Sequence, residues 1–147
     1  MLKTTIKKFE ALTANELYTI LRLRSEVFVV EQDCVYQDLD DKDKKALHVI
    51  GWYGNTIVAY TRIFDVKLYF NEASIGRVVV EQKHRSKGFG INIMNASIDA
   101  IKKHYNQTQI KISAQTYLIK FYNNLGFKEQ GKPYLEDGIP HTAMIKN

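Results

Sequence analysis

Apolar residues recur at helical spacing in three segments of the chain. After Thr13 they repeat every three to four residues, and Thr13 with Glu16 matches a capping box, which predicts the start of a helix. This apolar face consists of Leu17, Ile20, Leu21, Leu23, Val27 and Phe28. A second helix is indicated after Gly90 by Ile91, Met94, Ile98 and Ile101. A short third helix is expected over residues 118–125, ended by Gly126.

Runs of β-branched and aromatic residues predict strands around these helices. Residues 46–53 and 56–64 indicate a hairpin closed by Gly54-Asn55. The other expected strands cover residues 3–9, 74–80, 109–114, 128–134 and 141–146, with a turn at 136–140 and a polar loop at 31–45. No repeat or linker interrupts the pattern, so we expect one α+β domain over residues 1–147.

Composition and charge limit the binding partners and the cellular compartment that we expect for this protein. The formal net charge is +5, but the basic residues are scattered, which favours a solvated surface over nucleic-acid binding. The single cysteine, Cys34, cannot form a disulfide within the chain, and this favours a reducing cytoplasm. The N-terminus has no signal-peptide core, and no apolar stretch reaches membrane-spanning length. We therefore expect neither a nucleic acid nor a membrane as partner.

A glycine-containing loop joins a valine-rich strand to the second long helix. Residues 78–80 are valines, and Arg85, Gly88 and Gly90 follow just before the helical pattern begins. At a helix N-terminus the first backbone N–H groups lack partners and the helix dipole is positive, while glycine lets a ligand approach closely. The loop therefore predicts a phosphate site. Its spacing matches neither a P-loop nor a dinucleotide fingerprint.

Two motifs resemble those of one enzyme family. Arg-x-x-Gly-x-Gly at residues 85–90 resembles the acetyl-coenzyme A signature of the GCN5-related N-acetyltransferases (GNAT family). Residues 121–127, Phe-Tyr-Asn-Asn-Leu-Gly-Phe, look like the second motif of that family. Residues 22–32 and 34–40 are similar to its ElaA-like branch.

The resemblance implies an α/β sandwich with a mixed, mostly antiparallel central sheet and helices on both faces. The sheet should splay where strands 78–80 and 109–114 diverge. It also implies transfer of an acetyl group from acetyl-CoA to a primary amine on a small molecule or peptide, with Tyr122 protonating the departing thiolate. The implied cofactor contacts are Val78, Val79, Val80, Arg85, Ser86, Lys87, Gly88, Phe89, Gly90 and Gln115. A homodimer is left open, and so is a non-catalytic coenzyme A sensor.

The general base is not fixed by the sequence. The strand at residues 74–80 carries no carboxylate, so Glu31, His48, Glu72 or a water chain are the alternatives, and His48 also fits a hydrogen-bonded core position. Acidic residues in or beside the loop at 31–45 would favour a cationic acceptor: Glu31, Asp38, Asp40 and Asp41. The four histidines are too far apart in sequence to suggest a metal site, and Cys34 has no nucleophile signature.

Overall fold

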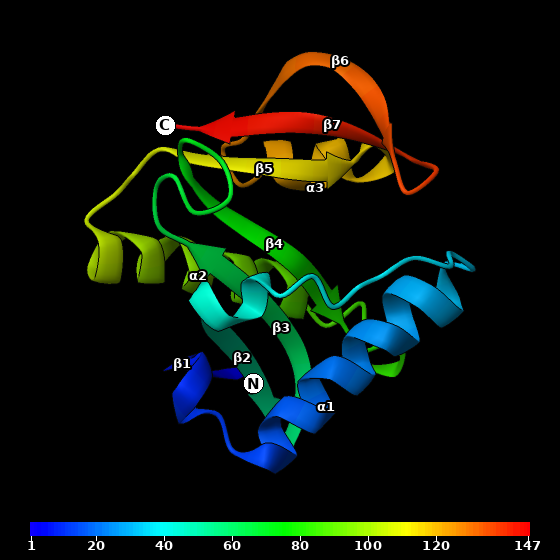
Figure 1. Cartoon of the computed structure of the whole chain (residues 1–147), viewed down its shortest axis with the longest axis vertical. Coiled ribbons are helices and arrows are strands. Elements are labelled where there is room, and N and C mark those ends of the chain that lie inside the picture. Colours follow the sequence, from blue (N-terminus) through cyan, green and yellow to red (C-terminus); the bar gives the residue numbers. More distant parts are fainter.

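The computed structural model describes all 147 residues and is built on one seven-stranded sheet, in the order β1-β2-β3-β4-β5-β7-β6 (Figure 1). The strands are β1 (Lys3–Lys8), β2 (Leu47–Tyr53), β3 (Thr56–Phe64), β4 (Ala73–Val80), β5 (Ile110–Gln115), β6 (Lys128–Glu136) and β7 (Ile139–Lys146). Neighbouring strands are antiparallel except β4 and β5, which are parallel. The expected mixed, mostly antiparallel sheet is confirmed.

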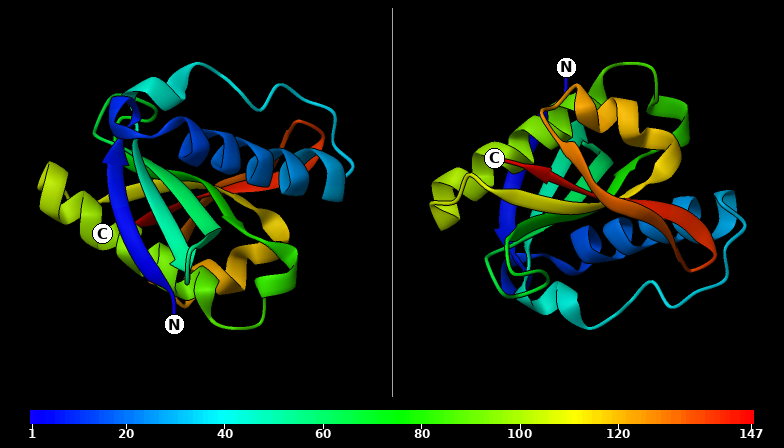
Figure 2. Two further views of the ribbon diagram at one scale, coloured as in Figure 1. Left: turned by 90° about the horizontal axis from the view of Figure 1, so that it is seen from below. Right: turned by 90° about the horizontal axis from the view of Figure 1, so that it is seen from above.

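Helices cover both faces of the sheet (Figure 2). The first, α1 (Ala14–Arg24), lies on one face, and α2 (Phe89–Tyr105) and α3 (Ile119–Asn123) lie on the other. Short 3₁₀ turns at Phe9–Ala11, Lys42–Lys45, Gln82–His84 and Thr116–Leu118 connect elements. The predicted capping box is present, because Thr13 Oγ1 accepts from the Glu16 N–H at 3.0 Å and Glu16 Oε1 accepts from the Thr13 N–H at 2.9 Å.

A π-helical segment, Ser25–Glu31, continues α1. Its wider turns are visible in the bonds from the Gln32 N–H to the Val27 carbonyl, 3.1 Å, and from the Cys34 N–H to the Val29 carbonyl, 3.0 Å. The sequence predicted helix here but not the wider turn, since apolar spacing does not separate the two. π-Helical turns are rare and occur often at functional sites. This one brings Glu31 and Gln32 to the open end of the sheet.

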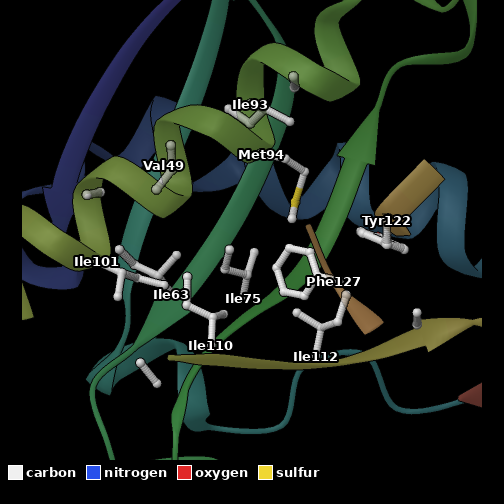
Figure 3. Packing of buried hydrophobic residues seen from close by; sticks show 14 of the residues in the cluster. Val49, Ile63, Ile75, Ile93, Met94, Ile101, Ile110, Ile112, Tyr122 and Phe127 are labelled. Atoms are coloured by element: carbon white, nitrogen blue, oxygen red, sulfur yellow. The ribbon is translucent and has the colours of Figure 1, made fainter. Parts of the chain in front are cut away.

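Alternation along the strands divides the core between the two faces. On β2, Val49 packs in the larger cluster with α2, whereas its neighbour Ile50 packs in the smaller cluster with α1. In the larger cluster, Ile93 and Met94 of α2 lie over Ile75 and the strands around it (Figure 3). The two faces together fix the register of the sheet, because a slip of one residue would exchange the buried sets.

The C-terminal hairpin has a tighter turn than the sequence suggested. Its turn residues are only Asp137 and Gly138, both at positive φ of 52° and 77°, as in a type I′ turn. The expected turn at 136–140 is therefore too long. Pro140 belongs to β7 rather than to the turn. It lies beyond the last pair of β7 with β5, where its missing N–H costs no bond to that strand.

The sheet splays between β4 and β5. These strands pair only at Ala73 with Ile110 and at Ser74 with Lys111, and then diverge (Figure 1). A bulge in β4 accompanies the divergence, since Val79 pairs with Tyr60 of β3 but the next register position pairs Gly76 with Arg62. Within it Arg77 has a φ of 51°, unusual for a residue with a side chain. The predicted gap between these two strands is confirmed.

Candidate active site

A cavity of about 550 Å³ opens where β4 and β5 separate. Its walls come from β4, β5, the loop before α2, α3, the π-helical segment and the β6–β7 hairpin. Of the predicted cofactor contacts, those that line it are Val78, Val79, Val80, Arg85, Ser86, Gly88, Phe89, Gly90 and Gln115. Beyond Ser74 the edge of β4 that faces β5 has no strand partner. The cavity therefore offers an extended ligand both apolar surface and free backbone groups.

The glycine loop ends in the N-terminus of α2. Gly88 caps the helix at a φ of 80°, and the first backbone bond into the turn runs from the Asn92 N–H to the Gly88 carbonyl at 3.1 Å. The N–H groups before Asn92 in this turn thus have no helical partner. A Cβ added at Gly90 would lie 3.4 Å from Phe121 Cζ, so a side chain here would contact that ring. These residues fit a pyrophosphate group.

Arg85 and Lys87 take different positions. Arg85 donates to the Val80 carbonyl at 3.1 Å and forms a two-pronged ion pair with Glu31, at 2.5 and 2.8 Å. It therefore ties the glycine loop to the π-helical segment. Lys87 does not line the cavity, and its ammonium lies 5.2 Å from the ring centroid of Tyr53. The charge that faces the loop comes from backbone amides rather than from Lys87.

Tyr122 reaches the cavity from α3 and is 6% exposed. It lies at the edge of the larger core cluster, beside Phe127 (Figure 3), and its ring meets that of Phe121 edge-on at a centroid distance of 5.1 Å. Its hydroxyl has no hydrogen-bond partner in the protein. Burial raises the pKa of the Tyr122 phenol, so the proton stays on the oxygen at neutral pH. The hydroxyl is a free donor in the cavity wall.

Gln115 lies at the end of β5, where the gap between the strands is wide. Its side-chain amide exchanges two hydrogen bonds with Gln32 of the segment after α1, at 3.3 and 3.2 Å. Both residues line the cavity. The pair connects one wall to the other, and it holds the Gln115 amide in a defined orientation.

Two of the three substrate-side candidates lie away from the cavity. His48 is 1% exposed, with Nδ1 2.6 Å from the Tyr60 hydroxyl and Nε2 2.9 Å from the Asp43 carbonyl oxygen. Burial lowers its pKa, and it occupies the core position that was the alternative interpretation. Glu72 precedes β4 at the closed end of the gap and does not line the cavity. Glu31 does line it, but as the partner of Arg85.

The acidic loop does not supply free negative charge, which corrects the sequence interpretation. Asp38 binds Arg24 at 3.0 Å and Arg77 at 2.7 Å, and Asp40 binds Arg62 at 2.7 Å. With Asp43, which binds both Arg24 and Arg62, three aspartates thus balance three arginines in one buried network. Asp41 is exposed, and it does not line the cavity. Local sequence showed the carboxylates, but their arginine partners come from distant elements.

Breaking this network should destabilise the fold. Asp43 accepts from Arg24 at 2.7 Å and from Arg62 at 3.0 Å. Burial alone would raise its pKa, but the two arginines outweigh this and lower it. Asp43→Ala leaves buried positive charge uncompensated and should cost about 3–5 kcal/mol of unfolding free energy, measured by urea denaturation at pH 7. Asp99→Ala, at an exposed residue within α2 that makes no ion pair, is the matched control and should change it by under about 0.5 kcal/mol. Equal effects of the two would contradict the structural role.

Several polar residues of the cavity wall were not anticipated. Ser113 of β5 and Glu136, Asp137 and His141 of the C-terminal hairpin all line it. The sequence placed His141 only at the start of the last strand. The one available signal was strand alternation, but it required knowing that β7 pairs with β5 and that His141 lies opposite Gln115.

A splayed sheet with a glycine loop and a cavity at the gap is the arrangement expected of an acyl-CoA-dependent N-acyltransferase. The sequence pattern of the acetyltransferase (GNAT) domain matches residues 10–147. Protein ElaA of Escherichia coli K12 is 36% identical over 137 residues, which is 92% of this chain and 90% of that protein. The chain belongs to the GNAT family, and its predicted resemblance to the ElaA-like branch is confirmed.

Solved structures agree with this assignment. The crystal structure of an acyl-CoA N-acyltransferase from Pseudomonas aeruginosa superposes with a TM-score of 0.93 at 37% identity, covering 100% of both chains. That of E. coli ElaA gives a TM-score of 0.92 at 34% identity, again over 100% of both. No group of three or more potential ligand side chains that could hold a metal ion is present. No helix is both long and apolar enough to span a bilayer.

Proposed function

We propose that this protein transfers the acetyl group of acetyl-CoA to a primary amine by direct attack, with Tyr122 as general acid. The observation that carries the proposal is the shared cavity: free helix-terminal amides, an unpaired strand edge and an unpartnered phenol line one space. Membership of the GNAT family supports acyl transfer from coenzyme A. The acetyl group, the amine and the role of Tyr122 are the parts proposed.

The glycine loop would hold the pyrophosphate. Backbone N–H groups at the start of α2 point at the loop, and a negatively charged group is favoured there by the helix dipole. Ser86 has a φ of 64° and Gly88 one of 80°, so the loop turns tightly around this point. Arg85 would contribute through its pairing with Glu31, which fixes the loop against the first helix, and Lys87 only at long range.

The pantetheine arm would lie in the gap between β4 and β5. Val78, Val79 and Val80 present the unpaired strand edge, whose N–H groups can bind amides and polarise the thioester carbonyl. Gln115 faces them from the other strand, with its amide oriented by Gln32. A coenzyme A thioester supplies an acyl carbon activated towards amines, and the protein's part is to position it and exclude water.

Tyr122 would protonate the thiolate as it leaves. Its phenol is buried, keeps its proton at working pH and has no competing partner in the protein. Burial also disfavours the charged thiolate, so the proton acceptor becomes more basic in the same surroundings. General acid catalysis of this kind typically contributes about 10²–10⁴-fold.

A non-catalytic coenzyme A sensor is the alternative. The cavity argues against it, because it extends past Tyr122 to a polar wall on the β6–β7 hairpin that a coenzyme A binder would not need. The deciding experiment measures acetyl-CoA affinity by calorimetry and coenzyme A release with a panel of small amines, amino acids, polyamines and peptides. Release that depends on the amine supports the transferase. Tight acetyl-CoA binding with no coenzyme A release for any amine would instead support the sensor. A homodimer and a cytoplasmic location stay predictions.

A further inference from the structure

The β6–β7 hairpin brings a histidine and a glutamate to the cavity wall. His141 of β7 lies opposite Gln115 of β5 in the antiparallel register, so the two side chains share a face, and both line the cavity. Glu136 ends β6 and lines the same wall. The chemistry of coenzyme A binding and thiolate protonation described above uses neither residue.

The hydrogen bonds of His141 fix the proton on one ring nitrogen. Nδ1 lies 2.7 Å from the Ile139 carbonyl oxygen, which can only accept, so Nδ1 carries the hydrogen. In the neutral ring Nε2 is then an acceptor. The residue is 7% exposed, and its ring stacks on that of Tyr134 at a centroid distance of 6.3 Å and an interplanar angle of 23°. The ring is thus held in one orientation.

Glu136 is positioned by its own partners. Ser113 Oγ donates to Glu136 Oε1 at 3.2 Å, and the Tyr134 hydroxyl contacts the same Ser113 oxygen. The second carboxylate oxygen, Oε2, faces His141 Nε2 at 3.5 Å. With a neutral imidazole, two acceptors therefore face each other with no proton between them. A ligand that donates N–H groups would satisfy both.

Charge on the remaining wall favours a cation. Arg85 is paired with Glu31, and Arg77 with Asp38. Among the charged residues that line the cavity, Glu136 and Asp137 are left without a basic partner other than His141. The negative charge that would favour a cationic acceptor therefore comes from this wall and not from the loop at 31–45, where the sequence analysis expected it.

We propose that Glu136 and His141 form the acceptor subsite, which binds a primary amine as its ammonium ion, and that His141 Nε2 is the general base. The inference rests on the proposed acyl transfer. A primary ammonium has three N–H donors, enough to bind the carboxylate and the imidazole together. An amine with an apolar or uncharged stem fits this wall. A carboxylate near the amine would be repelled by Glu136 and Asp137.

The ammonium gives one proton to His141 Nε2, and the freed nitrogen lone pair forms a C–N bond to the thioester carbonyl carbon. The C–S bond breaks with its electron pair on sulfur, which takes a proton from the Tyr122 hydroxyl. Of the three ammonium protons, one passes through His141 to solvent, one stays on the amide, and one replaces the proton lost by Tyr122. One proton is released per turnover.

The test uses two variants and two matched amines. His141→Gln removes the base, and Glu136→Gln removes the charge while keeping an acceptor for Ser113. The probes are n-butylamine and 4-aminobutyrate, which carries the same amine together with a carboxylate. His104→Gln and Glu129→Gln, at exposed residues that do not line the cavity, are the controls. Thermal melting confirms folding, and calorimetry should give unchanged acetyl-CoA affinity for every variant.

His141→Gln should lower kcat for n-butylamine at pH 7 by about 10²–10⁴-fold. The deficit should shrink as the pH rises towards the pKa of the amine, because more of it is already neutral. The titratable groups in contact with the ring are Glu136, 3.5 Å from Nε2, and Tyr134, which stacks on it, and both remain in the variant. The other charged residues of the cavity wall also remain: Glu31, Arg77, Arg85 and Asp137. Wild-type kcat at pH 7, or a deficit independent of pH, would overturn the base assignment.

Glu136→Gln should raise KM for n-butylamine by about ten- to hundredfold, with kcat changed far less, and should reduce the preference over 4-aminobutyrate. An unchanged KM and preference would overturn the subsite. Calorimetric titration of n-butylamine into the protein–coenzyme A complex separates the two proposals. Amine binding that depends on Glu136 but gives no turnover would overturn only the proposed acetyl transfer. Turnover that neither His141→Gln nor Glu136→Gln changes would overturn only the proposed acceptor subsite.

Discussion

Replacing Tyr122 by phenylalanine is expected to lower acetyl transfer by about ten- to thousandfold while leaving acetyl-CoA affinity nearly unchanged. The ring keeps its edge-on contact with Phe121 and its place beside Phe127, so the packing of α3 is preserved. Only the hydroxyl is lost, and it has no partner in the protein. The proton therefore matters mainly when the thiolate leaves. Steady-state turnover and calorimetric affinity, measured in parallel, give the two quantities.

A matched variant separates the lost proton from a general effect of tyrosine substitution. Tyr18 lies on α1 and is 74% exposed, and it does not line the cavity, so Tyr18→Phe should retain full turnover. Wild-type turnover in Tyr122→Phe, at a pH where chemistry limits the rate, would mean that water or another group protonates the thiolate. A large loss of acetyl-CoA affinity would instead assign Tyr122 to binding.

Gly90→Glu should weaken acetyl-CoA binding by at least about a hundredfold, because it places a carboxylate where the pyrophosphate would lie. The fold should survive. A carboxylate in the first turn of α2 is favoured by the helix dipole, and the new Cβ would meet the Phe121 ring at 3.4 Å, a tight contact that the ring edge must relieve. Calorimetry gives the affinity, and thermal melting gives the stability.

Two control variants separate the effect of the added charge on acetyl-CoA affinity from the effect of the added side-chain volume. Gly90→Ala adds the Cβ alone, so any smaller loss of affinity in this variant measures the steric part. Asn92→Glu puts the same charge in the same helical turn, on an exposed residue that does not line the cavity, and should reduce affinity much less. An unchanged affinity in a folded Gly90→Glu protein would remove the glycine loop from the pyrophosphate site.

The sequence by itself determined the elements and the residues proposed to bind coenzyme A. Hydrophobic periodicity and turn chemistry are local properties, so the capping box, the β2–β3 hairpin and the helix after the glycine loop could be predicted within a few residues. The junction proposed as the phosphate site could also be located, because its strand, loop and helix N-terminus are contiguous in the chain. The position of Tyr122 came from a motif that is equally local, and the structure places it in the same cavity.

Only the tertiary structure showed how the charged residues pair and which side chains form the wall proposed to bind the amine. From the sequence, Asp38 and Asp40 were expected to favour a cationic acceptor, but the fold brings Arg77 and Arg62 to them from β4 and β3. His48 could be a base or a core residue, and its contacts with Tyr60 and the Asp43 carbonyl settled its place. His141 became visible only through the pairing of β7 with β5. A carboxylate or an imidazole takes its function from the groups around it, and those groups come from distant parts of the chain.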